Sequence, residues 1–492
     1  MNYKFLKISA VILMGVSMTS CKKYLDINDD PNNAKVGDPK SLFSFAAASF
    51  ADNRAGGDMY IPMALGGQSI SSGGSAPDGT SWGSGGEDQY VFSPLTYANI
   101  WSQYFTSVAS NLRQAINLSE SSVPRNENGA AACKVILAET FYELTTTYGD
   151  IPFSEALDLN NLAPKFDAQK DVLEGCLGLL DAAIAQFDEE SDYNFGSYDL
   201  FYYNADNQFD DIGKWIKAAK SIKLRILMTM VDKDPSKATE IAGMIATGGF
   251  LESPEDNMKV AFENVAGKRN PKFELKDKYL PPGLDFFYAS PYVLDFMKSK
   301  NDPRIPYFFR LSPGASDYEA IQPGDDATKK TSKLASTLHS PAQPEYVFTY
   351  QELLFYKAEI YARGLSLDGV NLVKANASYK EAVKESAIFF GVPTSDAAAF
   401  ADSLPVINNA SDLIKQINYQ HWIDKFDRGV DAFIQWRRSG PAGSETPDLT
   451  LPFGAQSGGL FRRYEYPQSA ELASNPNAPA LIHYTEKVWF DL

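Results

Sequence analysis

The side chains best suited to recognise a ligand are aromatic residues that stand in loops, outside any helical pattern. The candidates are Trp82, Tyr90, Phe286, Phe287 and Tyr288. Trp82 lies in a stretch rich in glycine and serine, residues 64–88, and long loops of this kind often carry binding residues. The CH faces of sugar rings stack on flat aromatic rings, and a few polar groups complete such a site. These positions predict oligosaccharide binding; the alternative is that the rings pack beneath their own loops.

A catalytic set for a hydrolase is not evident. Residues 79–83 match the G-x-S-x-G pattern around Ser81, but that motif works between a strand and a helix, and here it lies in the glycine-rich stretch. The three histidines, His339, His421 and His483, are far apart in the sequence. Neither H-E-x-x-H nor C-x-x-C occurs, which argues against a zinc site. We therefore predict that the protein is not an enzyme.

Paired carboxylates leave one enzymatic alternative open. A glycoside hydrolase needs two carboxylates at a set separation across the sugar bond, and a sequence does not give that separation. Asp150 and Glu155 are close in the sequence, and Glu352 and Glu359 share a predicted helix. The structural interpretation is that Asp150 ends a helix and that Glu359 pairs with Arg363 four residues later. A surface glycoside hydrolase therefore remains the enzymatic alternative.

No cofactor is predicted. Asp26, Asn28 and Asp30 resemble the start of an EF-hand calcium loop, but Pro31 stands where that loop requires glycine. If a metal ion is bound elsewhere, calcium held by aspartate and backbone oxygens is the ion that the chemistry favours.

The composition is that of a folded globular protein with no affinity for nucleic acid. The chain has 492 residues, of which 44% are hydrophobic and 22% are charged, enough to bury a large core without disulfides. Its formal charge of -17 argues against binding to a phosphate backbone. Cys133 and Cys176 lie in apolar, helix-like stretches and are predicted to be small core residues, although a disulfide between them stays open.

The N-terminus has the pattern of a lipoprotein signal peptide. Lys4 and Lys7 precede an apolar run, Ile8 to Met18, that is too short for a transmembrane helix. The three residues before Cys21 resemble a lipobox, which predicts acylation of that cysteine with palmitate-type chains. Several acyl chains suffice as the sole membrane anchor. Lysines rather than aspartate follow Cys21, which favours the outer membrane; an ordinary secretory signal is the alternative.

Helical periodicity dominates the rest of the chain. Leu137, Phe141, Leu144 and Tyr148 fall on one helical face, and Gly149 is expected to end that helix. Further helices are predicted over residues 171–187, 214–232, 350–363, 373–390 and 411–437, and short strands over residues 258–263 and 346–349. There is no alternation of strands and helices typical of a parallel sheet. The pattern predicts a mainly α fold with long irregular insertions.

Six segments resemble the SusD/RagB family of nutrient-binding lipoproteins, in particular its second SusD-like branch. They occur in the same order as in the family and span most of the chain after Cys21. The segments are Tyr24 to Asn32, Ala138 to Ala156, Trp215 to Arg225, Asn301 to Arg304, Thr349 to Glu359, and Gln420 to Arg438 with Arg463 to Pro467 and Asn475.

The resemblance implies a fold, a partner and a location. The expected fold has tetratricopeptide-like helix pairs that carry irregular ligand-binding insertions. The expected partner is a SusC-like TonB-dependent transporter, which the lipoprotein covers at the outer face of the outer membrane. The expected organisation is a signal peptide over residues 1–20, a lipidated tether over 21–40 and a single domain over 41–492.

The resemblance also implies that the protein captures an oligosaccharide without chemical conversion. In the family, aromatic residues from loops contribute to the glycan site, which supports the candidates above, with Trp82, Phe287 and Tyr288 foremost. Capture of peptides or glycoprotein fragments by the same scaffold is an alternative. A structural subunit that gates the transporter and has no ligand of its own is another.

Overall fold

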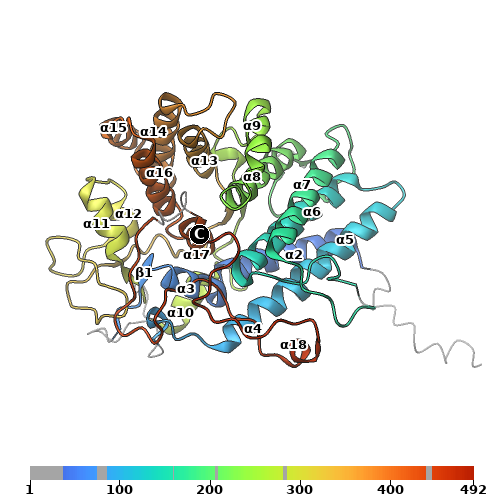
Figure 1. The fold of residues 1–492 in the computed structure, drawn as a ribbon, viewed down its shortest axis with the longest axis horizontal. Coiled ribbons are helices and arrows are strands. Elements are labelled where there is room, and N and C mark those ends of the chain that lie inside the picture. Colours follow the sequence, from blue (N-terminus) through green and yellow to red (C-terminus); the bar gives the residue numbers. More distant parts are fainter. Residues whose placement is uncertain (1–36, 75–85, 159, 205–208, 281–284, 439–445) are drawn as a thin grey trace, which may run out of the picture. The chain divides into compact units, whose positions relative to one another are not determined.

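The computed structural model describes residues 37–74, 86–158, 160–204, 209–280, 285–438 and 446–492. Residues Pro39–Leu492 form one compact unit. Helices dominate the described residues, whereas the strands are short (Figure 1). The predicted mainly α fold class is therefore confirmed. The domain boundaries within the first 41 residues remain predictions.

The N-terminal half of the compact unit contains a series of helices in which neighbours along the chain pack together. They are α2 (Pro39–Ala55), α3 (Gly57–Gly66), α4 (Pro94–Gln103), the π-helical segment η2 (Tyr104–Ala109), α5 (Ser110–Ser121), α6 (Glu127–Tyr148), α7 (Gln169–Gln186), α8 (Ile212–Met230) and α9 (Lys237–Thr247). Helices α5, α6, α7 and α8 contact one another in chain order. The predicted face of α6, from Leu137 to Tyr148, is buried in the core, and the helix ends at Gly149 as expected.

The C-terminal half repeats this arrangement. Its helices are α10 (Pro271–Tyr279), α11 (Pro291–Ser299), α12 (Ile305–Phe308), α13 (Tyr350–Arg363), α14 (Leu372–Phe389), α15 (Thr394–Ser403), α16 (Ala410–Asp424), α17 (Gly429–Arg438) and α18 (Ala470–Ser474). Helix α13 packs on α14 and α16, and α14 packs on α15. Figure 1 shows these four helices grouped together. Packing of consecutive helices in pairs agrees with the expected tetratricopeptide-like scaffold.

One helix prediction was wrong. The sequence predicts a single helix over residues 411–437, but the structure has two, α16 and α17, with a turn at residues 425–428 between them. The turn directs charged side chains inward: Lys425 and Arg428 both bind the buried carboxylate of Glu352 on α13, at 2.8 Å and 3.0 Å. A continuous helix would place the apolar residues Trp422, Phe426, Val430 and Phe433 on one face but would not make this turn, so the ion pairs favour the break.

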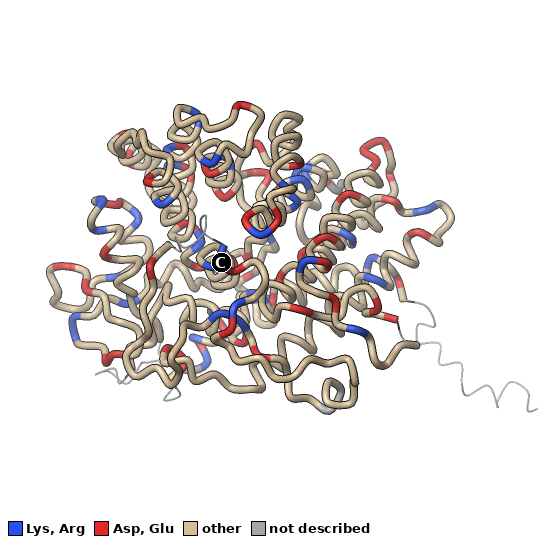
Figure 2. Tube along the Cα trace, in the orientation of Figure 1, with Lys and Arg blue, Asp and Glu red and all other residues tan. Residues whose placement is uncertain are grey.

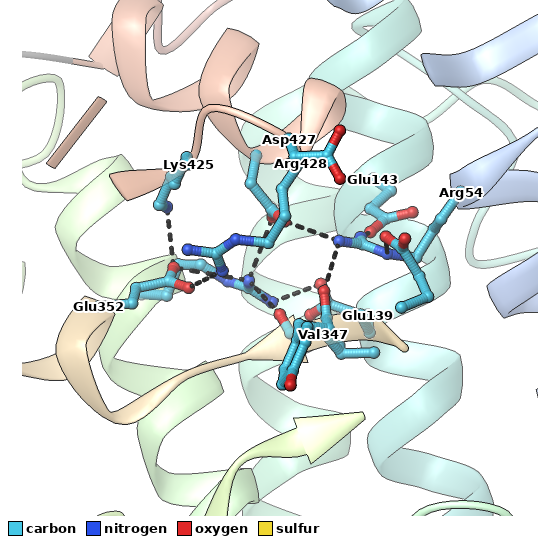
Figure 3. Close-up of polar contacts among 12 residues, drawn as sticks. Arg54, Glu139, Glu143, Val347, Glu352, Lys425, Asp427 and Arg428 are labelled. Carbon is cyan, nitrogen blue, oxygen red and sulfur yellow. Dashed lines mark hydrogen bonds and ion pairs between the residues drawn. The ribbon is translucent and has the colours of Figure 1, made fainter. Parts of the chain in front are cut away.

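Buried ion pairs connect the helices at the centre of the compact unit. Arg54 on α2 forms ion pairs with Glu143 on α6, with Glu345 at 3.2 Å and with Asp431 on α17 at 2.7 Å. Figure 3 shows this arginine near Glu139 and Glu143, with Glu352, Lys425 and Arg428 at the other end of the same network. The charged groups compensate one another, which is the condition under which a folded protein tolerates buried charge.

Short antiparallel strands complete the described fold. Strand β4 (Met258–Val260) pairs with β8 (Glu345–Phe348), close to the two predicted strands, and β2 (Tyr203–Asn204) pairs with β3 (Phe209–Asp210). A four-stranded sheet that the sequence did not predict has the order β1-β5-β7-β6. Its strands are β1 (Ile70–Ser71), β5 (Tyr288–Ala289), β7 (Lys333–Leu334) and β6 (Phe309–Arg310). This sheet brings together segments that are more than 200 residues apart in the chain.

The short helical turns in the described chain are η1 (Glu87–Gln89), η3 (Gly196–Tyr198) and η4 (Pro254–Asp256). Cys133 and Cys176 are buried and unpaired, as expected of small core residues. In the part of the chain that the structure describes, none of the helices combines the length and the apolar character needed to cross a bilayer.

Candidate functional site

A pocket of about 460 Å³ opens next to the four-stranded sheet, where the connection between β6 and β7 meets the segment around Gln89. Polar side chains supply much of its lining, and one aromatic ring borders it. The side chains that matter for recognition are Gln89, Glu319, Asp325, Asp326, Thr328 and Phe453. The volume lies within the range of small-ligand sites in proteins.

Backbone hydrogen bonds to the sheet position the connection that lines the pocket. The amide of Ile321 donates to the carbonyl of Ala289 in β5 at 2.9 Å, and the amide of Ser332 donates to the carbonyl of Glu319 at 2.8 Å. Thr331 Oγ1 accepts from the amide of Thr328 at 2.9 Å and so closes the turn at the end of the connection. The pocket wall is thus an extension of β5 and β7.

The buried carboxylate of Asp88 joins three segments at the pocket. Its Oδ2 accepts hydrogen bonds from the amides of Ser72 at 3.2 Å and Gly324 at 3.1 Å. The hydroxyl of Ser71, in β1, lies 3.5 Å from the same oxygen. Because one acceptor serves donors from β1 and from the lining connection, Asp88 holds these two segments in register with the short turn that carries Gln89.

Residues 452–454 are held against the connection by their backbone. The amide of Phe453 donates to the carbonyl of Pro323 at 2.9 Å, and the amide of Gln456 donates to the carbonyl of Gln89 at 3.3 Å. Gly324 has a φ of +87°, and a Cβ at this position would collide with the carbonyl of Phe453. Glycine is therefore required for this close approach.

The ring of Phe453 is the exposed aromatic group of the pocket. It is 69% exposed, although phenylalanine is among the residues most often buried. Phe453 was not predicted from the sequence, yet a signal was present: it stands between Pro452 and Gly454, outside any helical pattern, as the predicted aromatic residues do. An exposed flat ring beside hydrogen-bonding groups can stack on a sugar face while polar groups bind the hydroxyls.

The pocket also carries negative charge. Glu319 and Asp325 make no hydrogen bond or ion pair through their carboxylates with other described residues, so these oxygens are available to accept hydrogen bonds. Figure 2 shows that Lys and Arg are interspersed with Asp and Glu along the chain. A neutral ligand rich in hydroxyl groups suits a pocket lined by the carboxylates of Glu319 and Asp325, whereas these carboxylates would repel an anionic ligand.

The described candidates from the sequence analysis are buried. Tyr90, Phe286, Phe287 and Tyr288 are between 1% and 8% exposed, so their rings do not present an open face in this structure. Tyr288 lies in β5 against Gly73, and the ammonium group of Lys333 lies 5.0 Å from the centre of its ring. Tyr288 packs with Ile321 and Ala327, next to the pocket lining. Ligand contact by these four residues remains a prediction.

Tyr90 supports the loops next to the pocket. Its hydroxyl accepts a hydrogen bond from Gln68 Nε2 at 2.8 Å, and the same nitrogen donates to the carbonyl of Thr450 at 2.7 Å. Burial raises the pKa of Tyr90 above its usual value of 10.0, so this hydroxyl stays protonated. The pair connects the end of α3 to the segment that leads to Phe453.

Trp82 and Cys21 lie outside the described residues, as does the G-x-S-x-G match. The residues on either side of the segment that contains Trp82 are described. A Cβ on Gly74 would lie 2.6 Å from the Asp326 carboxylate, and one on Gly86 would lie 3.1 Å from the Gln89 side chain. Both flanks of the segment that contains Trp82 therefore lie next to pocket residues.

None of the described histidines lines the pocket, although His483 Nδ1 lies 2.9 Å from the hydroxyl of Thr485. His421 is buried, and burial lowers its pKa well below 6.5. His339 is buried between two carboxylates, and His483 lies near Glu465 at 3.9 Å. Within the described ranges there is also no group of three or more His, Cys, Asp or Glu side chains arranged to hold a metal ion.

A protein-family model identifies the family to which the chain belongs. The model of the second SusD-like family, described as starch-binding and associating with the outer membrane, matches residues 75–467. The chain belongs to this family. SusD-like proteins are nutrient-binding proteins associated with the outer membrane. Among curated protein sequences, none matches the chain.

Solved structures share the SusD-like fold. A chitin-binding protein has a TM-score of 0.74 at 21% identity over 92% of this chain and 100% of its own. A SusD-like protein from Bacteroidetes has a TM-score of 0.76 at 19% identity, with 93% and 100% covered. A chitin-binding SusD homologue from Flavobacterium johnsoniae has a TM-score of 0.71 at 20% identity, with 92% and 98% covered. These similarities show a common fold along nearly the whole chain.

Proposed function

We propose that this SusD-like protein captures an oligosaccharide in the pocket beside Phe453 and does not alter it chemically. The observation that carries the proposal is the exposed Phe453 ring at the border of a pocket with carboxylate, amide and hydroxyl side chains. The ring provides a stacking surface, and Gln89, Glu319 and Asp325 provide groups for sugar hydroxyls. The family description, starch-binding, and the two chitin-binding neighbours support a glycan as the ligand.

The wider proposal concerns where the protein works and what receives the ligand. Acylation of Cys21 would anchor the chain to the outer membrane, and the compact unit would face the outside of the cell. A SusC-like TonB-dependent transporter would then accept the oligosaccharide. The lipobox-like pattern and the family's association with the outer membrane support this arrangement.

Affinity gel electrophoresis tests the proposal. The soluble chain, residues 22–492, would be run through gels that contain soluble starch, glycol chitin and a panel of plant and microbial polysaccharides. We expect at least one polysaccharide to retard the protein. For that polysaccharide, Phe453→Ala should weaken binding about tenfold. Stacking of a nucleobase on an aromatic side chain contributes about 1–3 kcal/mol, a sugar face should contribute at the lower end of this range, and about 1.4 kcal/mol is a factor of ten.

Phe45→Ala is the matched control. Phe45 is 54% exposed on α2, so the change removes a comparable exposed ring that does not line the pocket. A Trp82→Ala variant, run alongside, tests the remaining sequence candidate. Equal retardation of Phe453→Ala and Phe45→Ala would contradict the assignment of the pocket, and no retardation on any polysaccharide would contradict glycan capture itself. Calorimetry with peptide mixtures would then test the peptide alternative.

A further inference from the structure

His339 is buried between two carboxylates that belong to different parts of the fold. Its Nδ1 lies 3.1 Å from Asp285 Oδ2, and its Nε2 lies 3.1 Å from Asp427 Oδ1. Asp285 precedes β5, whereas Asp427 lies in the turn between α16 and α17. A carboxylate only accepts hydrogen bonds, so both contacts are hydrogen bonds only when both ring nitrogens carry protons. The arrangement is thus specific for the imidazolium form.

Tyr60 provides an alternative donor when the ring is neutral. Its hydroxyl lies 3.1 Å from Asp427 Oδ1 and 3.2 Å from His339 Nε2, and it has one proton to donate. With the imidazolium, that proton goes to Asp427. With a neutral ring protonated at Nδ1, it can go to Nε2, and Asp427 Oδ1 then loses both of these donors. Loss of one proton therefore rearranges the whole contact.

We propose that His339 is a positioning residue for the pocket. Its imidazolium bonds to both Asp285 and Asp427 and thereby fixes the four-stranded sheet to the turn between α16 and α17. This pair of hydrogen bonds, the pin, breaks when the ring loses one proton. The role in ligand binding rests on the proposed function, whereas the pin itself does not. Binding would then be strongest at neutral to mildly acidic pH and would weaken as the ring loses its charge.

The contacts from His339 to the pocket wall are continuous. Asp285 Oδ1 accepts from the amide of Phe287 at 3.1 Å, and the carbonyl of Phe287 accepts from the amide of Leu334 in β7 at 3.1 Å. Two residues after Phe287, the carbonyl of Ala289 in β5 accepts from the amide of Ile321, which lines the pocket. His339 itself follows β7 by five residues. The sheet is therefore connected to the pin at two places: before β5 through Asp285, and after β7 through His339.

Charged groups from each neighbouring element face this contact. Lys276 on α10 donates to the carbonyl of His339 at 3.1 Å and lies 3.6 Å from Asp285. Lys272 on the same helix lies 3.2 Å from Asp427 and 3.7 Å from Glu345 on β8. The ammonium groups of the two lysines stabilise the negative charges of Asp285 and Asp427. Both carboxylates therefore stay ionised when His339 loses a proton, and the neutral ring then lies between them.

The direction of the pKa shifts sets the pH range. Burial lowers the pKa of His339, but Asp285 and Asp427 outweigh this effect and raise it above 6.5. A raised histidine pKa stabilises the fold below the pKa of the unfolded chain, and this stabilisation is lost as pH rises through the folded value. Burial alone would raise the pKa of both aspartates, but their cationic neighbours lower it below 3.8, so they stay charged across this range.

A small cavity borders one side of the contact, at Asp427. It has a volume of about 20 Å³ and is lined by Lys272, Leu338, Asp427 and Arg428 among others. That volume is sufficient for one water molecule. A water molecule in this cavity would lie beside Asp427, one of the two carboxylates that face His339.

Amide hydrogen exchange without ligand tests the pin directly. The soluble chain, residues 22–492, which contains the entire compact unit, would be compared at pH 6 and pH 9 after correction for intrinsic exchange. We expect the protection of residues 285–289 and 319–324 to fall about tenfold at pH 9, the equivalent of losing one hydrogen bond to a charged group. In His339→Gln, whose side chain cannot titrate, the same residues should show no such difference.

Two further variants keep the test decisive. His483→Gln, a change to an exposed histidine, should behave as the wild type. Asp427→Asn, which keeps the shape but removes one charge from beside the ring, should move the loss of protection to lower pH even if His339→Gln does not fold. An unchanged profile in the wild type, or the same fall in His339→Gln, would overturn the pin. Neither result depends on whether any polysaccharide binds, so a failure of the proposed function is recognised separately by the gel experiment.

Discussion

Arg54→Ala should lower the free energy of unfolding by about 3–5 kcal/mol, the usual cost of removing one partner from a buried ion pair. Arg54 is fully buried and forms ion pairs with Glu143, Glu345 and Asp431. Its guanidinium also donates to the carbonyl of Tyr346 at 3.1 Å. Alanine leaves buried carboxylates without their cation and also leaves a cavity. The loss therefore arises chiefly from uncompensated charge.

Urea unfolding followed by tryptophan fluorescence measures this loss, and the chain contains six tryptophans as probes. Arg54→Lys retains the charge without the planar donor group, so its stability should lie between those of the wild type and Arg54→Ala. Arg125→Ala is the control, because Arg125 is exposed and pairs with Glu127 at the surface, where ion pairs contribute little. A loss below about 1 kcal/mol for Arg54→Ala would show that the network does not need this cation.

Arg54→Ala should also change how the free energy of unfolding depends on pH. Burial tends to raise the pKa of Asp431, but Arg54 and its cationic neighbours outweigh burial and lower it to about 2. A lowered carboxyl pKa stabilises the fold above the unfolded value, about 4, and this contribution disappears as pH falls toward 2. Without Arg54 the pKa should rise, so Asp431 would become protonated earlier. The difference in stability between wild type and variant should therefore narrow below about pH 4.

Local patterns were sufficient to predict several of the long helices, whereas the helices before residue 127 and many of the short ones were not predicted. The helix predicted over residues 350–363 agrees with α13, and Gly364 ends it with a φ of +73°, a conformation that glycine adopts without strain. The stripe from Leu137 to Tyr148 likewise identified the buried face of α6. Such signals lie within a few residues of one another, so they do not depend on the rest of the chain.

The turn at residues 425–428 shows where local patterns fail. The apolar stripe of Trp422, Phe426, Val430 and Phe433 continues across the break, and all four residues are buried. What favours the break is the contact of Lys425 and Arg428 with Glu352, more than 70 residues earlier. A single sequence does not reveal this partnership, so periodicity alone predicts one helix.

The binding residues were harder to predict for the same reason. An aromatic residue in a loop can be exposed or covered, and the cover comes from distant segments. Tyr288 is covered by Gly73 and Lys333, whereas the residues that the structure describes leave Phe453 69% exposed. Proline and glycine next to a loop aromatic therefore identify candidates, but exposure is decided by tertiary contacts.

Asp88→Ala should impair ligand binding more than it impairs folding. The change removes the acceptor shared by the amides of Ser72 and Gly324, both of which are buried or nearly so. An unpaired buried donor costs about 1–3 kcal/mol, so both segments should move to find water or new partners. The amide of Phe453 donates to the carbonyl of Pro323, next to Gly324, so displacement of this segment should disturb the stacking surface as well.

Two measurements separate the local effect from the global one. Exchange of the Ser72 and Gly324 amides should accelerate in Asp88→Ala, while amides in α6 and α13 keep their protection. In gels that contain soluble starch or glycol chitin, the retardation seen for the wild type should disappear. Asp88→Asn, which keeps one acceptor oxygen, should retain part of the protection and part of the binding.

Asp317→Ala is the matched control, because Asp317 belongs to the same connection but is exposed and pairs with Lys298 at the surface. It should alter neither amide exchange at Gly324 nor retardation in the gel. Slow exchange of Ser72 and Gly324 in Asp88→Ala would contradict the role of the carboxylate. Fast exchange with unchanged retardation would instead place the glycan elsewhere on the protein. The combination of fast exchange and lost retardation is expected, because the shared acceptor and the exposed ring are parts of one wall.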